Sequence, residues 1–286
     1  MMTAKSLTDW RLTRDALQQA ISLNQLQVIV PTINSEDYIE IVLGYYKDIG
    51  LPITLVVDSK SIDATEEKSR GMVHELIRME NRSSVVEGMI QTLSNQTGAQ
   101  WVLRVDDDEL PSLAMLTFVA QTIESQQLSA AGFPRKQCAV SHNGRLRASR
   151  LHSASFHTQW RLYRPGQVQY TSAIHTPGFI PPPDASVIAP DPCFMVHLDW
   201  SLHAYQSRLA KIERYDRHTS QTGSQWRSFY LYEEDEQHGV MAFETVQNPE
   251  FHTVARRIQQ QFPNNCIEKP TRLQNLRIWL QDRLSR

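Results

Sequence analysis

Short apolar runs alternate with amphipathic stretches over the first half of the chain. The runs are rich in Val, Ile and Leu, as is typical of strands buried on both faces of a parallel sheet, and they occupy residues 26–30, 53–57 and 101–105. Apolar residues at helical spacing occupy residues 8–23, 39–46, 63–78 and 83–93. Such strand-then-helix alternation with right-handed crossovers predicts an α/β fold with a mainly parallel sheet flanked by helices.

The pattern changes after a helix expected at residues 113–126. Two extended runs flank Asn143-Gly144, a typical hairpin turn, which predicts a hairpin over residues 130–151 and makes the sheet mixed. Further strands are expected at residues 160–164, 168–170 and 193–197. Six prolines between Thr176 and Pro192 predict a long irregular loop over the functional edge of the sheet.

Helical patterns dominate the last third of the chain. They occupy residues 199–215, 249–261 and 270–284. We therefore interpret residues 1–220 as one α/β domain and residues 221–286 as a helical C-terminal extension.

Composition excludes several classes of protein. The net charge of -2 leaves no basic excess to neutralise the phosphates of a nucleic acid. The three cysteines lack the spacing of metal ligands, which favours a reducing compartment. No apolar run approaches the roughly 20 residues that span a bilayer, and the N-terminus lacks a signal-peptide pattern. We expect a cytoplasmic protein with at most peripheral membrane association.

A dense acidic cluster follows the third apolar run. Its four consecutive residues are Asp106, Asp107, Asp108 and Glu109. Two carboxylates about 4 Å apart repel by roughly 4 kcal/mol in a partly buried site, so the cluster needs a cation or solvent. One interpretation is a divalent-cation site at the carboxyl edge of the sheet, and the other is a solvated turn that caps the next helix. Pro111 stands where an EF-hand loop needs Gly, which excludes that loop.

Three motifs together resemble the signatures of family 2 glycosyltransferases of the GT-A fold. They lie at residues 28–34 (VIVPTIN), 56–65 (VVDSKSIDAT) and 105–109 (VDDDE). A weaker match is similar to the tail of bacterial members that decorate lipopolysaccharide cores and related glycans, and it comprises residues 197–200, Arg208, Lys211 and Tyr215. The strong resemblance covers residues 26–112 and implies a GT-A-like, Rossmann-type fold.

The resemblance implies a nucleotide-sugar site built from several loops. Pro31, Thr32 and Asn34 lie in the first strand-to-helix loop, where the family holds the nucleotide. Asp58 ends the second strand, where the family's aspartate accepts a hydrogen bond from the base, although such a residue can also be an ordinary strand end. Arg82 lies where related enzymes direct a positive charge towards the phosphates, and its alternative is a solvated arginine at a helix start.

The resemblance also implies a bound Mn²⁺ or Mg²⁺. Asp106 and Asp108 match the outer positions of the family's DXD motif, and we expect Asp108 to bind the cation and Asp106 to contact ribose or metal-bound water. Asp106 and Asp107 are also expected to contact the nucleotide sugar. Carboxylate oxygens suit these hard cations, which neutralise charge as the nucleoside diphosphate departs. His197 is the expected third metal ligand, or else a buried, hydrogen-bonded histidine.

Two departures from the family pattern affect the chemistry. Ile33 stands where many members have Tyr, so an aromatic stack on the base is missing. No acidic base motif follows the strand near Tyr163, which leaves His175 and Asp184 as candidates for the base. An inverting transfer needs such a base and a retaining one does not, so the stereochemistry is open.

These features predict a metal-dependent glycosyltransferase of the hexosyltransferase type. It would transfer a sugar from a nucleotide sugar, with UDP-sugars favoured, to a glycan or lipid-linked hydroxyl acceptor in bacterial surface glycan synthesis. The alternative is a catalytically degenerate GT-A domain that binds a glycan or a partner. A sugar-nucleotide pyrophosphorylase is disfavoured because residues 31–34 contain no glycine-rich phosphate loop. A metal-dependent phosphohydrolase would release phosphate from nucleotides without any acceptor.

Overall fold

Two compact units contain the part of the chain that the structure describes. The structure, a computed structural model, describes residues 4–81, 86–151, 158–172, 177–219, 221–234 and 242–267. Unit 1 comprises Met1–Arg135 and Ala154–Val196, and unit 2 comprises Lys136–Ser153 and His197–Arg286. The functional division between residues 1–220 and 221–286 stays a prediction.

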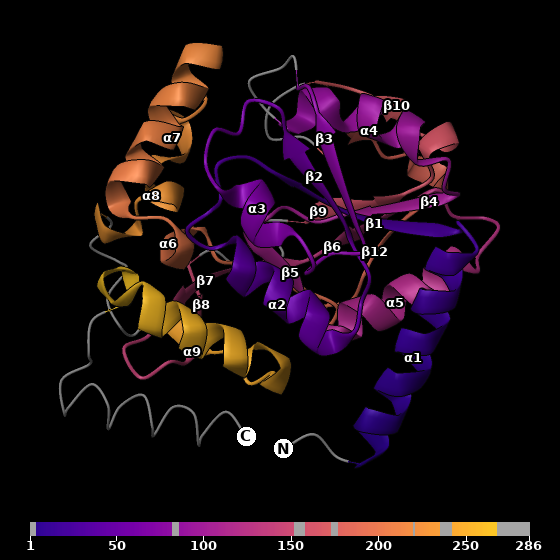
Figure 1. Cartoon of the computed structure of the whole chain (residues 1–286), viewed down its shortest axis with the longest axis horizontal. Coiled ribbons are helices and arrows are strands. Elements are labelled where there is room, and N and C mark those ends of the chain that lie inside the picture. The colour runs from indigo at the N-terminus through magenta and orange to yellow at the C-terminus, as the bar shows by residue number, and fades with distance from the viewer. Residues whose placement is uncertain are drawn as a thin grey trace. The chain divides into compact units, whose positions relative to one another are not determined.

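A seven-stranded mixed sheet forms the centre of unit 1 (Figure 1). Its spatial order is β12-β6-β9-β4-β1-β2-β3. The strands are β1 (Leu26–Thr32), β2 (Thr54–Asp58), β3 (Glu75–Met79), β4 (Trp101–Arg104), β6 (Ala130–Phe133), β9 (Gln159–Tyr163) and β12 (Ser186–Ile188). The first four run parallel, β9 is antiparallel to both β4 and β6, and β12 is parallel to β6. The predicted α/β fold with a mixed, mainly parallel sheet is therefore confirmed.

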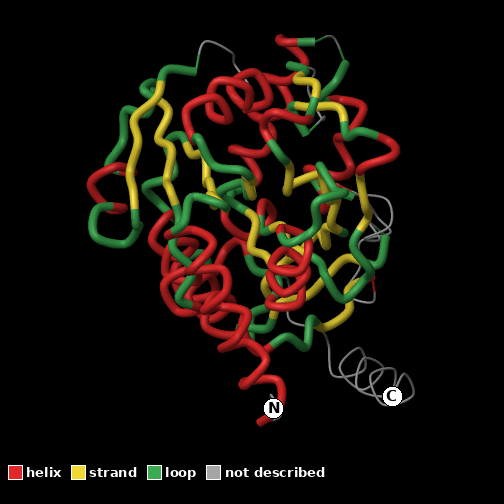
Figure 2. Tube along the Cα trace, turned by 90° about the vertical axis from the view of Figure 1, so that its right-hand side faces the viewer, coloured by secondary structure: helices red, strands yellow, loops and turns green. Residues whose placement is uncertain are grey.

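Helices cover both faces of this sheet. They are α1 (Ala4–Ser22), α2 (Ile39–Ile49), α4 (Ile90–Thr97) and α5 (Leu113–Ile123). Ile29 and Val56 point towards α4 and share a core cluster with its Leu93, whereas α1, α2 and α5 lie on the other face (Figure 1). Figure 2 shows the strands side by side with helices packed against them. Burial on both faces explains why the strands of the parallel part are almost continuously apolar.

The helix predicted over residues 63–78 is wrong for most of its length. α3 (Thr65–Ser69) is a short helix, and β3 then forms an edge strand of the sheet. Leu76 of β3 lies opposite Leu55 of β2. Because an edge strand is only partly buried, β3 lacks the continuous apolar run of its neighbours, and its apolar residues also satisfy helical spacing. Part of the helix predicted at residues 83–93 lies outside the described residues, and the rest is η1 (Val86–Met89) followed by α4.

The proline-rich segment is not the irregular loop that we predict from its composition. Within it are β11 (Phe179–Ile180), η4 (Pro183–Ala185) and β12. β11 pairs with β10 (Gln169–Tyr170), and β12 extends the central sheet at its edge. Proline removes a backbone donor, and it is tolerated here because the prolines flank these short strands and stay out of them.

Unit 2 contains a small antiparallel sheet and several helices. The predicted hairpin is confirmed where β7 (Arg135–Val140) pairs with β8 (Leu146–Ser149), and Gly144 in its turn has a φ of 70°. Its first four residues, 130–133, instead form β6 of the central sheet. β14 (Phe243–Thr245) pairs with β8. The predicted helix at residues 199–215 is divided into α6 (Asp199–Leu202) and α7 (Tyr205–His218).

The remaining elements are short, apart from one helix. They are β5 (Glu109–Pro111), β13 (Met195–His197), α8 (Arg227–Tyr230), α9 (His252–Gln261), η3 (Pro165–Gln167), η5 (Ser224–Trp226), η6 (Tyr232–Glu234), η8 (Pro249–Phe251) and η9 (Pro263–Asn265). The helix predicted at residues 249–261 is confirmed by η8 and α9, and the one at residues 270–284 lies outside the described residues.

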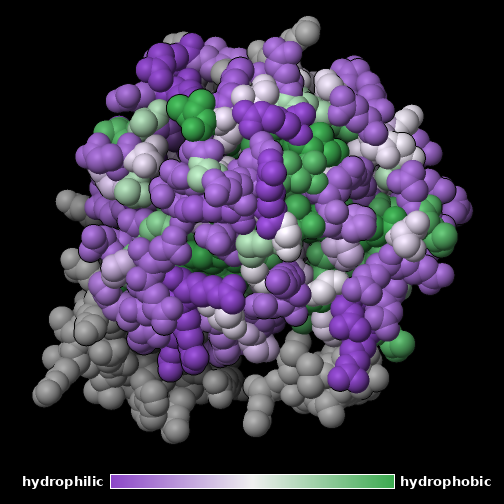
Figure 3. All heavy atoms as spheres, in the orientation of Figure 1, coloured by the Kyte–Doolittle hydropathy of each residue, from purple (hydrophilic) through white to green (hydrophobic). Residues whose placement is uncertain are grey.

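Among the described helices, none is both long enough and apolar enough to cross a bilayer. The face seen in Figure 3 is mainly hydrophilic, with hydrophobic residues in separate groups. Cytoplasmic location stays a prediction.

Candidate functional site

The order of strands creates a switch point between β1 and β4. From β1 the chain passes to β2 and β3 on one side, and it then crosses to β4 on the other side of β1. In open α/β sheets the carboxyl ends of the strands at such a point flank a ligand-binding crevice. Thr32 ends β1, Asp58 ends β2, and Asp106 follows the end of β4 closely. Because β1 separates β2 from β4, the ends of these two strands lie about 10 Å apart.

Asp107 joins the loop after β4 to the loop after β1. Its Oδ2 lies 2.6 Å from Thr32 Oγ1, 2.6 Å from Ser35 Oγ and 3.1 Å from Tyr38 OH. Burial raises the pKa of Tyr38 well above its ordinary value, and the charges of Asp107 and Asp108 raise it further, so its hydroxyl stays a hydrogen-bond donor. Neither Ser35 nor Tyr38 is predicted as a site residue from the sequence. Their only local signal is that Ser35 lies in a segment rich in capping residues.

Asp106 belongs to a buried network of ion pairs. Arg161 Nη2 of β9 lies 2.5 Å from Asp106 Oδ2 and 2.7 Å from Glu109 Oε1. Arg104 Nη2 lies 3.4 Å from Asp106 Oδ1, and Arg135 Nη1 lies 3.2 Å from Glu109 Oε1. Both oxygens of Asp106 therefore face guanidinium groups. Its predicted contacts with a cation and a nucleotide sugar stay predictions.

Glu109 and Arg161 are the deepest members of this network. The side chain of Glu109 is 0% exposed and that of Arg161 is 1% exposed. Burial, followed by repulsion from Asp106, raises the pKa of Glu109 to about 8, while Arg135 opposes the shift. The sequence signal for this network is a charged residue inside an apolar strand, as in WVLR at residues 101–104 and QWRLY at residues 159–163.

Asp108 is a buried carboxylate in the turn between β4 and β5. It is 6% exposed. Its charge raises the pKa of both Tyr38 and Glu109. A further cation close to Asp108 would relieve this repulsion. Its predicted role as a metal ligand stays a prediction.

The loop after β1 and the loop after β2 are tied together beside Asp58. Asn34 N donates to Ser61 Oγ at 2.8 Å, and Ile62 N donates to Asn34 Oδ1 at 2.9 Å. Asn34 has a φ of 50°, a conformation that Asn adopts more readily than most residues. Asp58 is buried and its Oδ1 accepts a hydrogen bond from Lys60 N at 2.9 Å. The predicted residues Asn34 and Asp58 are thus held by neighbouring loops of one edge.

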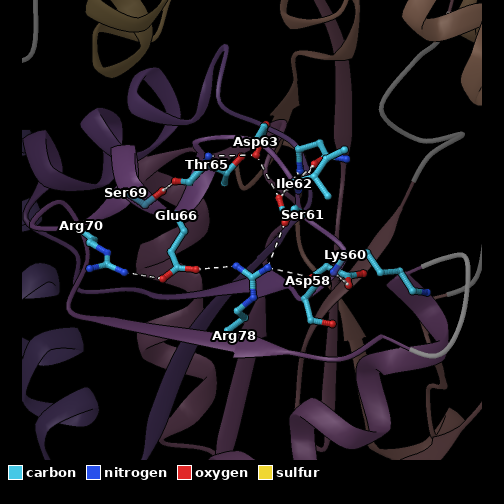
Figure 4. Close-up of polar contacts among 12 residues, drawn as sticks. Asp58, Lys60, Ser61, Ile62, Asp63, Thr65, Glu66, Ser69, Arg70 and Arg78 are labelled. Atoms are coloured by element: carbon cyan, nitrogen blue, oxygen red, sulfur yellow. Dashed lines mark hydrogen bonds and ion pairs between the residues drawn. The ribbon is translucent and has the colours of Figure 1, made fainter.

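Arg78 supports the loop after β2 from the adjacent strand β3, as Figure 4 shows. Its Nη2 donates to Ser59 O at 2.9 Å and to Ser61 O at 3.1 Å, and its Nη1 donates to Glu66 Oε2 at 2.7 Å. Backbone carbonyls accept these bonds, so Arg78 restrains the course of the chain immediately after Asp58.

Asp63 connects the same two loops and lies two residues before the start of α3. Its Oδ2 accepts from Glu36 N at 3.0 Å, and its Oδ1 accepts from Thr65 N at 3.1 Å and from Ser61 Oγ at 3.2 Å. Burial alone would raise the pKa of Asp63, but these hydrogen bonds outweigh it and lower the pKa below its ordinary value. The sequence prediction that Asp63 caps the following helix is wrong in position, because the N-cap residue is Ala64, which makes no side-chain cap hydrogen bond, and Asp63 instead accepts from the backbone N of Thr65, the first residue of α3.

Replacing Asp63 with Asn should lower the unfolding free energy by about 1–2 kcal/mol above pH 5, because the charged acceptor is lost. A carboxylate with a lowered folded-state pKa stabilises the protein above its unfolded-state pKa, and it loses that contribution as pH falls through the folded-state value. The difference between variant and wild type should therefore shrink below about pH 4. Urea unfolding across this pH range measures it. A difference that stays constant with pH would contradict the argument.

In unit 2, His197 and Asp199 are both buried, and only Leu198 separates them in the sequence. His197 Nδ1 contacts Gln137 Oε1 of β7. Asp199 Oδ1 lies 2.9 Å from Lys211 Nζ and 3.1 Å from His203 Nδ1. Burial opposes ionisation of Asp199, but Lys211 and then His203 hold its pKa well below the ordinary value. The role of His197 as a metal ligand stays a prediction.

The two candidates for a catalytic base receive no support. His175 lies outside the described residues, as does Arg82. Asp184 is exposed in η4, immediately before the amino end of β12. β12 is parallel to β6, and β9 is antiparallel to both β6 and β4, so β12 runs in the same direction as β4. Asp184 therefore lies at the edge opposite to Asp58 and Asp108, and its role as base stays a prediction.

Comparisons with known proteins give matches only among solved structures. No protein-family model and no curated protein matches the chain. The chain is similar to S. aureus TarS 1–349 in complex with UDP-GlcNAc, with 14% identity, coverage of 85% of this chain and 82% of that one, and a TM-score of 0.43. It covers 54% of a longer TarS chain at 14% identity, with 84% of this chain aligned and a TM-score of 0.44.

A third similar structure comes from Desulfovibrio desulfuricans G20 and is provisionally described as a nucleotide-diphospho-sugar transferase. It shares 9% identity over 85% of this chain and 99% of that one, with a TM-score of 0.40.

Proposed function

We propose that this protein is a glycosyltransferase that uses a nucleotide-sugar donor. One observation supports this most strongly: the three motif loops meet at the switch point of the parallel sheet, with Thr32 and Asp107 in direct contact. The motif residues Asp58, Thr32 and Asp108 therefore come from the carboxyl edge of three successive strands, β2, β1 and β4. A nucleotide laid across this edge would have its base near Asp58 and its phosphates near the acidic turn.

A divalent cation, Mn²⁺ or Mg²⁺, fits the acidic turn. We propose Asp108 as its main ligand, because the two oxygens of Asp106 face arginines and Asp107 faces three hydroxyls. The expected role of His197 as a metal ligand comes from the family resemblance alone. When bound, the cation would offset charge on the two phosphates of the donor. Asp106, held by Arg104 and Arg161, would contact ribose or a metal-bound water.

The remaining residues would bind and orient the donor. Asp58 would accept a hydrogen bond from the base, and the loop of Pro31, Thr32 and Asn34 would lie along the nucleoside. Arg82 is proposed near the phosphates. The acceptor is proposed to be a glycan or lipid-linked hydroxyl of a bacterial surface glycan, the transferred group a hexose, and the favoured donor a UDP-sugar.

Donor binding provides the direct test. A UDP-sugar at about 100 times its Kd with Mn²⁺ should raise the unfolding free energy by about 2.7 kcal/mol, seen as a higher melting temperature. Asp58→Ala should weaken donor binding about 10- to 100-fold, since a hydrogen bond to a charged group contributes about 1.5–3 kcal/mol. Asp48→Asn, on the exposed part of α2, is the matched control. If no nucleotide sugar stabilises the wild type in the presence of Mn²⁺ or Mg²⁺, the proposal fails.

A second candidate, a binding module without transfer, is favoured by one observation. Asp184 lies at the opposite edge of the sheet, so no base is identified among the described residues. The two candidate functions differ in whether the protein turns over its nucleotide-sugar donor. An enzyme releases the nucleoside diphosphate from its donor when an acceptor, or slowly water, is present, whereas a binding module does not.

A further inference from the structure

A tight turn follows Asp58 at the carboxyl end of β2. Ser61 N donates to Asp58 O at 2.9 Å, and Lys60 N donates to Asp58 Oδ1, also at 2.9 Å. Ser59 N donates to Met79 O of β3 at 2.8 Å. The orientation of the Asp58 carboxylate therefore depends on the path of the backbone through the residues that follow it.

The carbonyl groups of this turn accept hydrogen bonds from Arg78 of β3. Nη2 of Arg78 donates to Ser59 O at 2.9 Å and to Ser61 O at 3.1 Å, and Nη1 donates to Glu66 Oε2 of α3 at 2.7 Å. Figure 4 shows Arg78 between Glu66 and the turn. A planar guanidinium group has five N–H donors in fixed directions and can hold several acceptors at once, which the ammonium group of lysine does less well.

These contacts order the turn and add little to the core. The side chain of Arg78 is 46% exposed, and its hydrogen bonds to described residues all go to the turn and to Glu66. Arg70 provides a comparison, because it binds the other oxygen of Glu66, Oε1, at 2.8 Å and is 72% exposed. Among the described residues, Arg70 has no side-chain hydrogen bond to the turn. If Arg78 served only as an exposed ion pair, the two arginines would be equivalent.

We propose that Arg78 is a positioning residue for donor binding. It fixes the turn after Asp58, and through the turn it orients the carboxylate that accepts a hydrogen bond from the base. The inference rests on the proposed function, because Asp58 has this role only in a protein that binds a nucleotide sugar. Arg78 increases donor affinity because a turn that is already ordered loses less conformational entropy when the donor binds.

Steady-state kinetics of matched arginine variants tests the proposal. Arg78→Met should raise KM for the donor roughly 3- to 30-fold. Its kcat should stay within about twofold of wild type, because β1 separates β2 from the acidic turn after β4, and a loss of uniform binding raises KM alone. Arg78→Lys should recover part of the affinity, since it keeps the charge but not the planar group. Arg70→Met is the control, and an equal KM in Arg70→Met and Arg78→Met overturns the proposal.

A double-mutant cycle with Asp58 separates positioning from a general loss of structure. If Arg78 acts through Asp58, Arg78→Met should change the Kd for UDP less than about twofold in an Asp58→Ala background. A general structural effect would instead weaken binding by the same factor in both backgrounds. Calorimetry with UDP and Mn²⁺ measures each Kd, and full additivity of the two substitutions contradicts the positioning role.

Hydrogen exchange tests the order of the turn without any donor. The backbone amides of residues 59–62 all donate hydrogen bonds, so they should be protected in the wild type. Their exchange should become at least about tenfold faster in Arg78→Met and stay unchanged in Arg70→Met. Unchanged exchange in Arg78→Met overturns the proposal even if the wild type binds a donor. A wild type that binds no nucleotide sugar contradicts the proposed function instead, and exchange still decides whether Arg78 orders the turn.

Discussion

Asp108→Asn should lower kcat/KM for the nucleotide-sugar donor about 10²- to 10³-fold while the protein stays folded. This is the usual loss when one group that stabilises developing charge is removed, and each factor of ten corresponds to about 1.4 kcal/mol. Asn keeps the size of the side chain but cannot supply the negative charge that a divalent cation requires.

The thermal stability of Asp108→Asn should not fall with its activity. Asp108 adds to the negative charge that acts on Glu109 and Tyr38. Removing that charge relieves repulsion, so the melting temperature of Asp108→Asn should equal or exceed that of the wild type. Steady-state kinetics with Mn²⁺, together with thermal unfolding, measures both effects. Asp48→Asn is the control for an exposed acidic residue. Full activity of Asp108→Asn in the presence of Mn²⁺ or Mg²⁺ would refute the assignment.

Arg161→Met should destabilise the protein by about 3–5 kcal/mol. Arg161 contacts both Asp106 and Glu109, and its removal leaves buried negative charge without its main partner. The folded-state pKa of Glu109 is already raised to about 8. A carboxyl group with a raised folded-state pKa contributes stability at low pH and loses it as pH rises through that value. Without Arg161 the folded-state pKa of Glu109 should rise further, so the variant keeps losing stability above about pH 8, where the wild type no longer does, and the destabilisation should grow there.

Urea unfolding of paired variants measures this effect. Arg70→Met removes an exposed ion pair with Glu66 and should change the unfolding free energy by less than about 0.5 kcal/mol. The double variant Arg161→Met/Glu109→Gln should recover part of the lost stability, since no charge remains at Glu109. An effect of Arg161→Met as small as that of Arg70→Met would show that the buried network contributes little.

The central strands were predictable because a strand that is buried on both faces is a continuous run of apolar residues in the sequence. β1, β2 and β4 are apolar almost throughout, and the acidic residues follow β4 directly in the sequence. β3 was missed for the converse reason, since an edge strand with partly exposed residues has no such run. The proline-rich segment was predicted to be an irregular loop, but it contains the short strands β11 and β12. Composition shows where backbone N–H donors are missing, but it does not show that the edge of the central sheet can pair with a short strand between the prolines.

The partners of the candidate site residues were not predictable from the sequence. Arg161 lies 55 residues from Asp106, Tyr38 lies 69 residues from Asp107, and Gln137 lies 60 residues from His197. Such contacts depend on which strands become neighbours, and no local propensity encodes that. The same holds for Asp184, whose distance from the acidic turn follows from the direction of β12.

The α/β class, the three parallel strands of the motifs and the residues that end them follow from the sequence alone, because strand burial and strand ends are properties of short segments. Which of the clustered carboxylates is held by arginines, which by hydroxyls, and which edge of the sheet each residue occupies became clear from the fold. The interaction energy of a charged group depends on its burial and its partners, and both are set by packing between segments distant in sequence.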